Sequence, residues 1–263
     1  MNKPGVLIIS HGSRESSWVT LVDEAVTQLE EQIKQQQLKN LQVEASFLEL
    51  VEGRLIQDGI RRLEEQGVTD IFVIPLFVSS GSTHVDEIAY ALGVKEQPEL
   101  ETDLERFDFR AHIHYGKPVD DDAEVAQMIW DKVKHLSARP DREVIVIVGH
   151  GSRYDWFRQR WVHGISSLAE RVQHISGVAY ADYGLLNPES VRERVEYWSQ
   201  ERGYTVIVAP LFLSEGYFLN TAIPDRLRGL SYQYAGKALL PHPFLPKWTL
   251  KQIRSFLNER QYD

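Results

Sequence analysis

The 263-residue sequence contains no cysteine, and this absence removes several kinds of chemistry at once. Without thiols the chain cannot form disulfide bonds, zinc–thiolate sites, iron–sulfur clusters or a cysteine nucleophile. A metal ion bound by this protein must therefore be held by histidine, aspartate or glutamate side chains.

Long apolar segments are lacking too. No run approaches the roughly 18 apolar residues of a membrane-spanning helix, and the first residues lack the basic segment and apolar core of a secretion signal. We therefore expect a cytoplasmic protein with no membrane partner. Positive charge is also scarce, because 29 Lys and Arg face 38 Asp and Glu, for a net charge of −9. This balance argues against nucleic acid as a partner but leaves room for an acidic small molecule held by local arginines.

An internal duplication is the strongest pattern that the chain does contain. The segment GVLIISHGSR at 5–14 returns as VIVIVGHGSR at 144–153, which places His150 139 positions after His11 (150 − 11). A second pair of segments, 72–81 and 206–216, keeps the same order, with Pro75 and Pro210 separated by 135 positions (210 − 75). A period this long indicates two similar domains, which we place at residues 1–138 and 139–263.

Hydrophobic spacing predicts alternating strands and helices in each domain. Apolar, β-branched runs are typical of buried parallel strands, and steps of three and four residues are typical of amphipathic helices. We expect two flavodoxin-like α/β domains, each with a four-stranded parallel sheet flanked by helices. The predicted strands after the first lie at 43–50, 71–78, 109–115 (at the sheet edge), 144–148, 178–183, 206–212 and 237–240. The later predicted helices include 84–92, 120–136, 156–173, 188–201, 219–228 and 247–258.

Ligands of open α/β sheets bind beyond the carboxyl ends of the strands, so polar residues there are candidates for a site. His11 follows the first strand, Glu49 closes the second and His84 follows the third. Two imidazoles and a carboxylate form a plausible ligand set for Fe(II) or Co(II). His114 and Lys117 end the fourth strand at the same edge.

Ordinary structural roles remain open for these residues. His11 fits a hydrogen-bonded turn, and Gly12 with Ser13 fits a strand-to-helix turn with a helix cap. Glu49 fits simple solvent exposure, and His84 fits the first turn of a helix. The charged segment 95–105 fits a solvated loop.

Three motifs together resemble the class II chelatases: His-Gly-Ser-Arg after the first strand, Phe-Leu-Glu-Leu at 47–50, and Pro-Leu-Phe-Val-Ser-Ser-Gly at 75–81 followed by His84. The resemblance covers essentially the whole chain. Members of this family insert Fe(II) or Co(II) into sirohydrochlorin for sirohaem or cobalamin synthesis. The resemblance implies a lyase that needs no cofactor beyond its substrate metal.

Site residues follow from the resemblance, position by position. It implies that His11, Glu49 and His84 are the metal ligands and the catalytic residues. The remaining implied positions would bind the carboxylate-rich tetrapyrrole or line its site, and they are Ser13, Arg14, Ser79, Ser80, Gly81, His150 and Arg153. Arg54 is a further candidate for holding carboxylates. The aromatic residues Tyr154, Trp156, Tyr217 and Phe218 fit either a cover for the macrocycle or core packing.

The chemistry of metal insertion agrees with these residue types. Two pyrrole N–H protons must leave, and a neutral imidazole with an ordinary pKa of about 6.5 can hold a metal ion or accept a proton near neutral pH. We therefore expect activity to fall below about pH 6. Neither half contains a Walker sequence, so no ATP requirement is implied.

Two other functions remain open at this point: a non-catalytic metal or tetrapyrrole carrier, and a phosphate-binding enzyme that uses His-Gly-Ser-Arg as an anion loop. The chain ends without the histidine-rich extension of long cobalt chelatases, which favours iron. We expect a monomer in which the second domain completes the tetrapyrrole cleft opposite His11, with His150 on its wall. The second half offers Asn187, or the neighbouring Leu186, and Tyr217, Phe218 and Leu219 in place of the other ligands, so we expect the chemistry in the first half.

Overall fold

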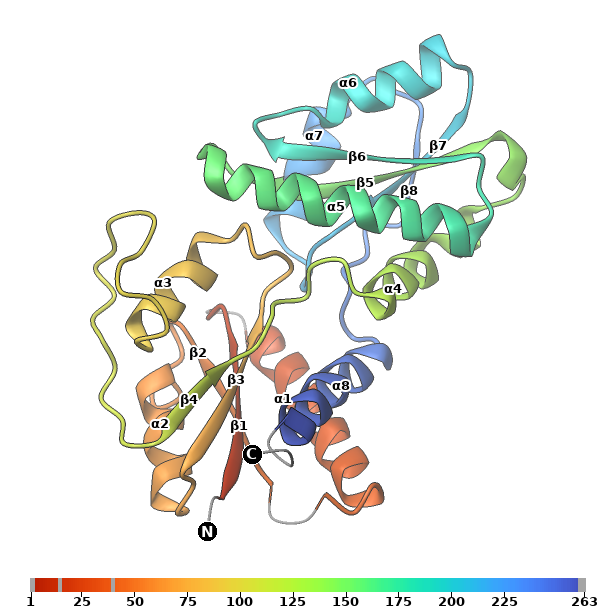
Figure 1. Ribbon diagram of the computed structural model, residues 1–263. Coiled ribbons are helices and arrows are strands. Elements are labelled where there is room, and N and C mark those ends of the chain that lie inside the picture. Colours follow the sequence, from red (N-terminus) through yellow and green to blue (C-terminus); the bar gives the residue numbers. More distant parts are fainter. Residues whose placement is uncertain (1–2, 14–15, 39–40, 260–263) are drawn as a thin grey trace. The chain divides into compact units, whose positions relative to one another are not determined.

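Strands and helices alternate along the chain in the computed structural model, which describes residues 3–13, 16–38 and 41–259 (Figure 1). The first half contains β1 (Pro4–Ser10), α1 (Ser16–Gln35), β2 (Gln42–Phe47), α2 (Ile56–Glu65), β3 (Asp70–Leu76), α3 (Thr83–Ala91), β4 (His112–Tyr115) and α4 (Ala123–Val133). The second contains β5 (Glu143–Gly151), α5 (Asp155–Ser176), β6 (Tyr180–Asn187), α6 (Val191–Glu196), β7 (Thr205–Pro210), α7 (Ile223–Arg226), β8 (Gln233–Tyr234) and α8 (Phe244–Glu259).

Each half builds one four-stranded sheet, and the two sheets have the same topology. The strand orders are β2-β1-β3-β4 and β6-β5-β7-β8, and every neighbouring pair is parallel. The predicted α/β duplication is therefore confirmed, as is the edge position of β4. In both sheets the chain order reverses beside the first strand, which is where open α/β sheets bind their ligands.

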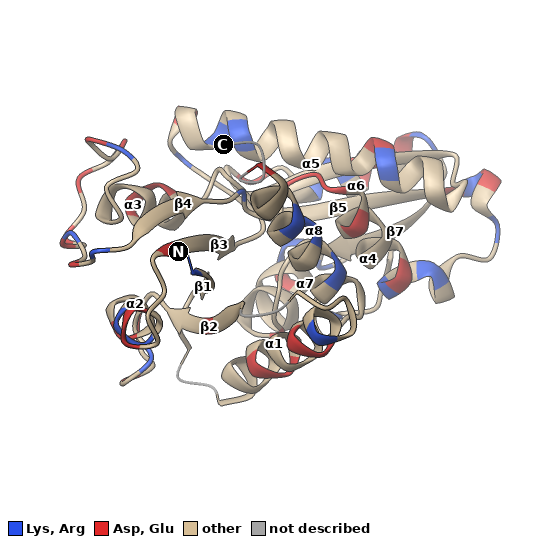
Figure 2. Cartoon of the chain, turned by 60° about the horizontal axis from the view of Figure 1, so that its bottom comes forward, with Lys and Arg blue, Asp and Glu red and all other residues tan. Residues whose placement is uncertain are grey.

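Helices cover both faces of the first sheet. Leu7, Ile9 and Val73 point to the face covered by α2 and α3, whereas Phe72 on the other face stacks on Phe256 of α8 with ring centroids 4.8 Å apart. Figure 1 shows α1 and α8 on one side of this sheet and α2 with α3 on the other. In Figure 2 most of the positions coloured as Lys, Arg, Asp or Glu lie on helices and connections, and β1 contains no charged residue. Burial on both faces explains the unbroken apolar runs of β1 and β3.

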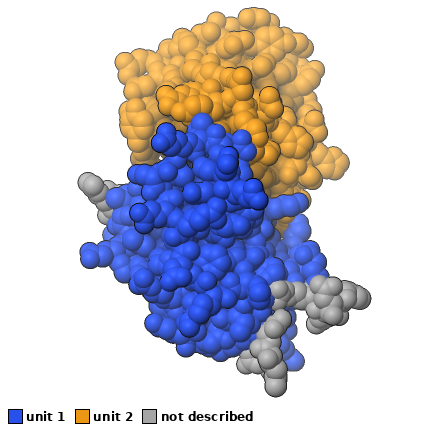
Figure 3. All heavy atoms as spheres, turned by 60° about the vertical axis from the view of Figure 1, so that its left-hand side comes forward, with its two compact units in different colours: residues 1–77, 83–118, 245–263 blue, residues 78–82, 119–244 orange. Residues whose placement is uncertain are grey.

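The chain divides into two compact units (Figure 3). The first contains Met1–Phe77, Thr83–Pro118 and Leu245–Asp263, and the second contains Val78–Ser82 and Val119–Phe244. These units do not match a single boundary between residues 138 and 139, because α8 packs in the first unit and α4 packs on α5 in the second. An amphipathic pattern tells that a helix buries one face, but it does not tell which sheet receives that face.

Some element bounds differ from the sequence predictions. The strand expected at 237–240 is wrong, since β8 is Gln233–Tyr234. Ala238, Leu239 and Leu240 are buried, and the N–H groups of Leu239 and Leu240 donate to the carbonyls of Phe212 and Leu213 in an irregular connection. Burial without sheet pairing produced the strand-like pattern there. None of the helices in the described part of the chain is both long and apolar enough to cross a membrane.

Candidate functional site

The carboxyl ends of β1 and β2 bring His11 and Glu49 together. The Leu48 N–H donates to the Ser10 carbonyl at 2.9 Å, which continues the pairing of the two strands past their ends. Gly12 then lies directly against the Glu49 backbone, so that any Cβ at position 12 would overlap the Glu49 carbonyl oxygen. Glycine is required here for close backbone approach, and this approach sets the spacing of the two side chains.

Hydrogen bonds fix the orientation of the His11 ring. Its Nδ1 lies 2.7 Å from the Gly12 carbonyl, which can only accept, so Nδ1–H is the donor and the lone pair of the neutral ring is on Nε2. The Trp18 indole N–H donates to the His11 carbonyl at 2.7 Å and holds the backbone of this turn. Nε2 lies 3.5 Å from Oε1 of Glu49. The chain thus directs Nε2 of His11 toward the Glu49 carboxylate.

Glu49 lies in a tight turn rather than in the strand. β2 ends at Phe47, so the predicted strand 43–50 is too long at its carboxyl end. Leu50 has a φ of +66°, and the Val51 N–H donates back to the Glu49 carbonyl at 2.9 Å. Such a positive φ is uncommon for a residue other than glycine, and the Glu49 side chain in this turn is 52% exposed.

His84 reaches the same place from the first turn of α3. Its ring meets the ring of His11 edge to face, with centroids 4.8 Å apart and an interplanar angle of 74°. The His84 Nδ1–H donates to Oε1 of Glu87 at 2.6 Å, because the ionised carboxylate can only accept. In the neutral ring the lone pair of His84 is therefore on Nε2, as it is in His11.

The hydrogen bonds of Glu87 and Thr102 at this site were not predicted from the sequence. Glu87 accepts from His84 through one oxygen and from the Thr102 hydroxyl through the other, at 2.8 Å. Burial raises the pKa of the Glu87 carboxyl, but these hydrogen bonds and the nearby imidazoles outweigh burial and hold that pKa below its ordinary value. The i, i+3 spacing of His84 and Glu87 was a usable signal for this contact, since such residues share one helix face.

The three predicted ligands are neighbours but do not yet form a closed set. No group of three or more His, Asp or Glu side chains within residues 3–13, 16–38 and 41–259 is arranged to hold a metal ion. The 3.5 Å between His11 and Glu49 is nevertheless close to the spacing of about 3.4 Å expected for two tetrahedral ligands of one ion bound at about 2.1 Å. As an ion pair, two side chains that are 43% and 52% exposed would add under about 1 kcal/mol to stability.

The predicted substrate contacts before α3 are engaged within the second unit. Ser79 is buried and its hydroxyl accepts from the Gly81 N–H at 3.0 Å, while the Ser80 N–H donates to Asp120 at 2.6 Å. A Cβ at Gly81 would collide with the backbone of α5. These three residues therefore shape a loop that packs on α5.

The remaining predicted substrate contacts, three arginines and Ser13, have different surroundings. Arg54 forms two hydrogen bonds with Asp23, at 2.9 and 2.7 Å, which hold its guanidinium in a structural role. Arg153 is exposed and donates to the neighbouring Tyr154 hydroxyl at 2.7 Å. Ser13 is partly buried in the turn after β1. The predicted contact at Arg14 lies outside the described residues.

The second half repeats the turn with different neighbours. The His150 Nδ1–H donates to the Gly151 carbonyl at 2.9 Å, as His11 does to Gly12. Gly151 lies against the carbonyl of Asn187, its partner in the strand register, so Asn187 occupies the position of Glu49. Phe218 meets the His150 ring edge to face, with centroids 5.1 Å apart, and so takes the place of His84.

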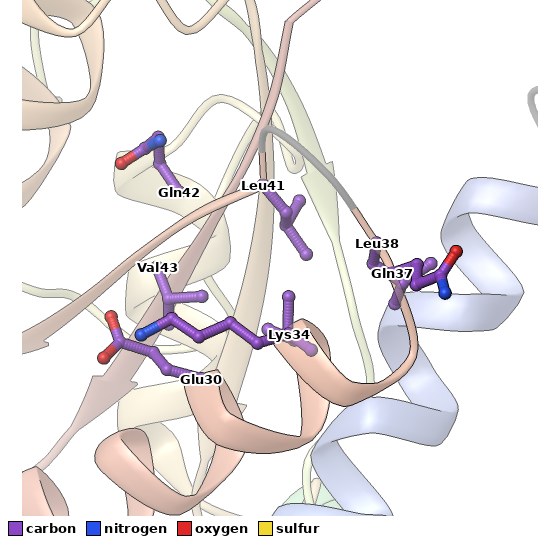
Figure 4. Close-up of a pocket in the computed structure, with 8 residues that line it drawn as sticks. Glu30, Lys34, Gln37, Leu38, Leu41, Gln42 and Val43 are labelled. Atoms are coloured by element: carbon purple, nitrogen blue, oxygen red, sulfur yellow. The ribbon is translucent and has the colours of Figure 1, made fainter.

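A separate groove of about 490 Å³ lies at the other end of the first sheet (Figure 4). It is lined by the end of α1 and the start of β2, among them Lys34, Leu41 and Val43. Val43 pairs with Val6, near the start of β1, whereas His11 follows the end of that strand. The groove therefore contains none of the candidate ligands.

Comparison with known proteins gives consistent results. The CbiX family model matches residues 5–136 and 144–255. A sirohydrochlorin ferrochelatase of Bacillus subtilis (strain 168) is 26% identical over 218 residues, which is 83% of this chain and 77% of the relative. A sirohydrochlorin cobaltochelatase of Methanopyrus kandleri is 27% identical over 142 residues, 49% of this chain and 94% of the relative. The solved structure of SirB from Bacillus subtilis with Fe3+ superimposes with a TM-score of 0.74 at 21% identity, covering 96% of this chain and 94% of that one.

Proposed function

The chain belongs to the CbiX family, and we propose from this premise that it is a sirohydrochlorin chelatase. It inserts Fe(II), or Co(II), into sirohydrochlorin, releases two protons and uses no ATP. The product serves sirohaem or cobalamin synthesis in the cytoplasm, and the enzyme acts as a monomer without nucleic acid. The observation that carries this proposal is the meeting of His11, Glu49 and His84 at the carboxyl edge of one parallel sheet.

The substrate ion is held by the first half, residues 1–138. Hydrogen bonds at Nδ1 leave the Nε2 lone pairs of His11 and His84 available to the ion. Glu49 offsets part of the ion's positive charge and supports loss of the pyrrole protons, for which an imidazole or carboxylate is the acceptor. Exposure of these side chains suits an ion that must enter, be transferred and leave with the product.

The second half, residues 139–263, contributes to binding the tetrapyrrole. Arg153 is an exposed cation suited to the acidic side chains of sirohydrochlorin. His150 orients the substrate rather than holding the ion, because Asn187 and Phe218 stand where the first half has ligands. Ser13 and Arg14 complete the proposed contacts, whereas the polar groups of the loop 79–81 are engaged within that loop and with Asp120.

The test is an anaerobic assay of purified protein with sirohydrochlorin and Fe(II) or Co(II), each alone and in competition, without nucleotide. Absorbance of the metallated ring should rise through many equivalents of product per protein. A rise that stops at one equivalent would indicate a carrier, and a requirement for ATP would contradict the proposal. His11→Ala is the matched negative control.

A further inference from the structure

A hydrogen-bonded chain from the segment after α3 ends on the candidate metal ligand His84. The Leu104 N–H donates to the Thr102 hydroxyl oxygen at 3.1 Å, Thr102 donates to Glu87 at 2.8 Å, and His84 donates to the other Glu87 oxygen at 2.6 Å. Both carboxylate oxygens of Glu87 are thus in use, and its side chain is 20% exposed. A carboxylate held from both ends has little freedom to rotate.

The segment that supplies Thr102 is itself anchored on α3. Asp86, which is buried, accepts from Lys95 and from the Glu99 N–H, and the Phe107 N–H donates to the Ala91 carbonyl at 3.0 Å. The acidic segment predicted as a solvated loop is therefore fixed at several points along its length. This anchoring places Thr102 reproducibly against Glu87.

We infer that Glu87, held by Thr102, is a positioning residue that fixes the tautomer and the ring orientation of His84 for metal capture. This inference rests on the proposed function. A histidine that donates one ring N–H to a carboxylate keeps the opposite nitrogen unprotonated and becomes a more basic ligand. The anchored segment thus acts on metal affinity through His84 without touching the ion.

The second half supports this assignment by contrast. Phe218 stands in the place of His84, and the residue three positions later is Thr221 instead of a carboxylate. The carboxylate accompanies the half that has a histidine to position. A purely structural role for Glu87 would not require this pairing.

Metal affinity and ring tautomer test the inference in the full-length protein. Co(II) affinity is measured by competition with a chromophoric chelator for wild type, Glu87→Ala, Thr102→Val and the control Glu143→Ala. Glu143, at the start of β5, also accepts hydrogen bonds through both carboxylate oxygens, from Ser137 and from the Ala138 N–H, but it is not part of the chain that ends on His84. Thermal unfolding of each variant reports its structural cost.

We expect Glu87→Ala to weaken Co(II) binding about 10- to 100-fold, the usual range when a metal-ligating side chain loses its hydrogen-bond partner. Thr102→Val should weaken binding less, and Glu143→Ala should lower the unfolding temperature while keeping affinity within about twofold. In a His84→Ala background, Glu87→Ala should cost no more than about twofold, because the residue it positions is gone. An equal loss in both backgrounds, or an unchanged affinity of Glu87→Ala, overturns the inference.

Nitrogen-15 NMR of labelled histidine separates this inference from the proposed function. In metal-free wild type the His84 ring, identified by its loss in His84→Ala, should show a protonated Nδ1. Glu87→Ala should give a mixture of tautomers, and an unchanged spectrum would overturn the inference. Failure of the wild type to metallate sirohydrochlorin would instead refute the proposed function.

Discussion

The two halves of the molecule form the same turn with different consequences. After β1 and after β5 a histidine donates from Nδ1 to the carbonyl of the next glycine, at 2.7 and 2.9 Å. Both glycines lie against the backbone of the neighbouring strand's end, where a Cβ would not fit. The repeated motif is therefore explained by backbone geometry in both halves, and its recurrence alone does not indicate a metal site.

The halves differ in what surrounds that histidine. His11 has a carboxylate 3.5 Å from Nε2 and a second imidazole at its edge. His150 has Asn187 and Phe218 in the corresponding positions. Ligand chemistry therefore depends on the residues that the second and third strands deliver, and the proposed division of labour can be tested one position at a time.

The largest contrast is expected from the histidines themselves. His11→Ala or His84→Ala should reduce metal insertion about 100-fold or more, because each removes a proposed ligand and proton acceptor. His150→Ala should instead raise the KM for sirohydrochlorin about tenfold and leave kcat nearly unchanged, as expected for lost uniform binding. Absorbance of the metallated product measures both constants. If His150→Ala were inactive and His11→Ala had normal activity, the chemistry would belong to the second half and the account would be contradicted.

The two glycines should be equally important for folding but not for metal binding. Gly12→Ala and Gly151→Ala each force a backbone shift that should lower the free energy of unfolding by about 1–3 kcal/mol, with added strain at Gly151, whose φ is +78°. Urea unfolding measures this cost. Co(II) affinity should fall only for Gly12→Ala, whose shift separates His11 from Glu49. Equal losses of affinity would show that both turns bind metal.

Introducing the ligand types of the first half into the second half should reduce the difference in metal binding between them. The double variant Asn187→Glu/Phe218→His gives the second half the residue types found at Glu49 and His84. We expect one additional, weaker equivalent of bound Co(II), because His150 already presents its Nε2. Equilibrium dialysis gives the stoichiometry. If it remains that of the wild type, the halves differ in more than these two side chains.

The smallest effect concerns acid stability. Since the folded protein holds the pKa of Glu87 below its ordinary value, the ionised carboxyl contributes stability above the unfolded pKa of about 4.3, and this contribution disappears as the pH falls through the lower folded pKa. The difference in unfolding free energy between wild type and Glu87→Gln should therefore shrink below about pH 4.3. Thr221→Ala, at the matching place in the second half, should show a constant difference. Urea unfolding across this pH range decides it, and a constant difference for Glu87→Gln would contradict the account.

Much of the fold follows from the sequence because the duplication and the apolar strands are local patterns. The recurrence of His-Gly-Ser-Arg predicted two similar domains, and the structure has two sheets of the same topology. The alternation of apolar and polar residues in 109–115 predicted that β4 lies at a sheet edge, as it does. The exchange of α4 and α8 between units is not a local property, since it depends on which sheet buries each helix. The strand predicted at 237–240 was wrong for a related reason, because buried apolar residues need not pair in a sheet.

At the candidate site, too, local patterns could be predicted from the sequence, whereas contacts that depend on the tertiary fold could not. Position at one predicted edge made His11, Glu49 and His84 candidates together with His114, and the family resemblance then selected the first three as the proposed ligands. Thr102 could not, because its contact with Glu87 depends on how the segment after α3 folds back. Ser79 and Gly81 belong to the same motif as His84, yet the Ser79 hydroxyl accepts from the Gly81 N–H, and Gly81 lies against the backbone of α5. Their contacts therefore stabilise the loop.

The position of the bound ion tests the central claim most directly. Crystals grown with Co(II), measured on both sides of the cobalt absorption edge, give an anomalous difference map that identifies cobalt without reference to activity. The account predicts a peak about 2.1 Å from Nε2 of His11, shared with Glu49 and His84. A peak bound to His150, with nothing at His11, would contradict it.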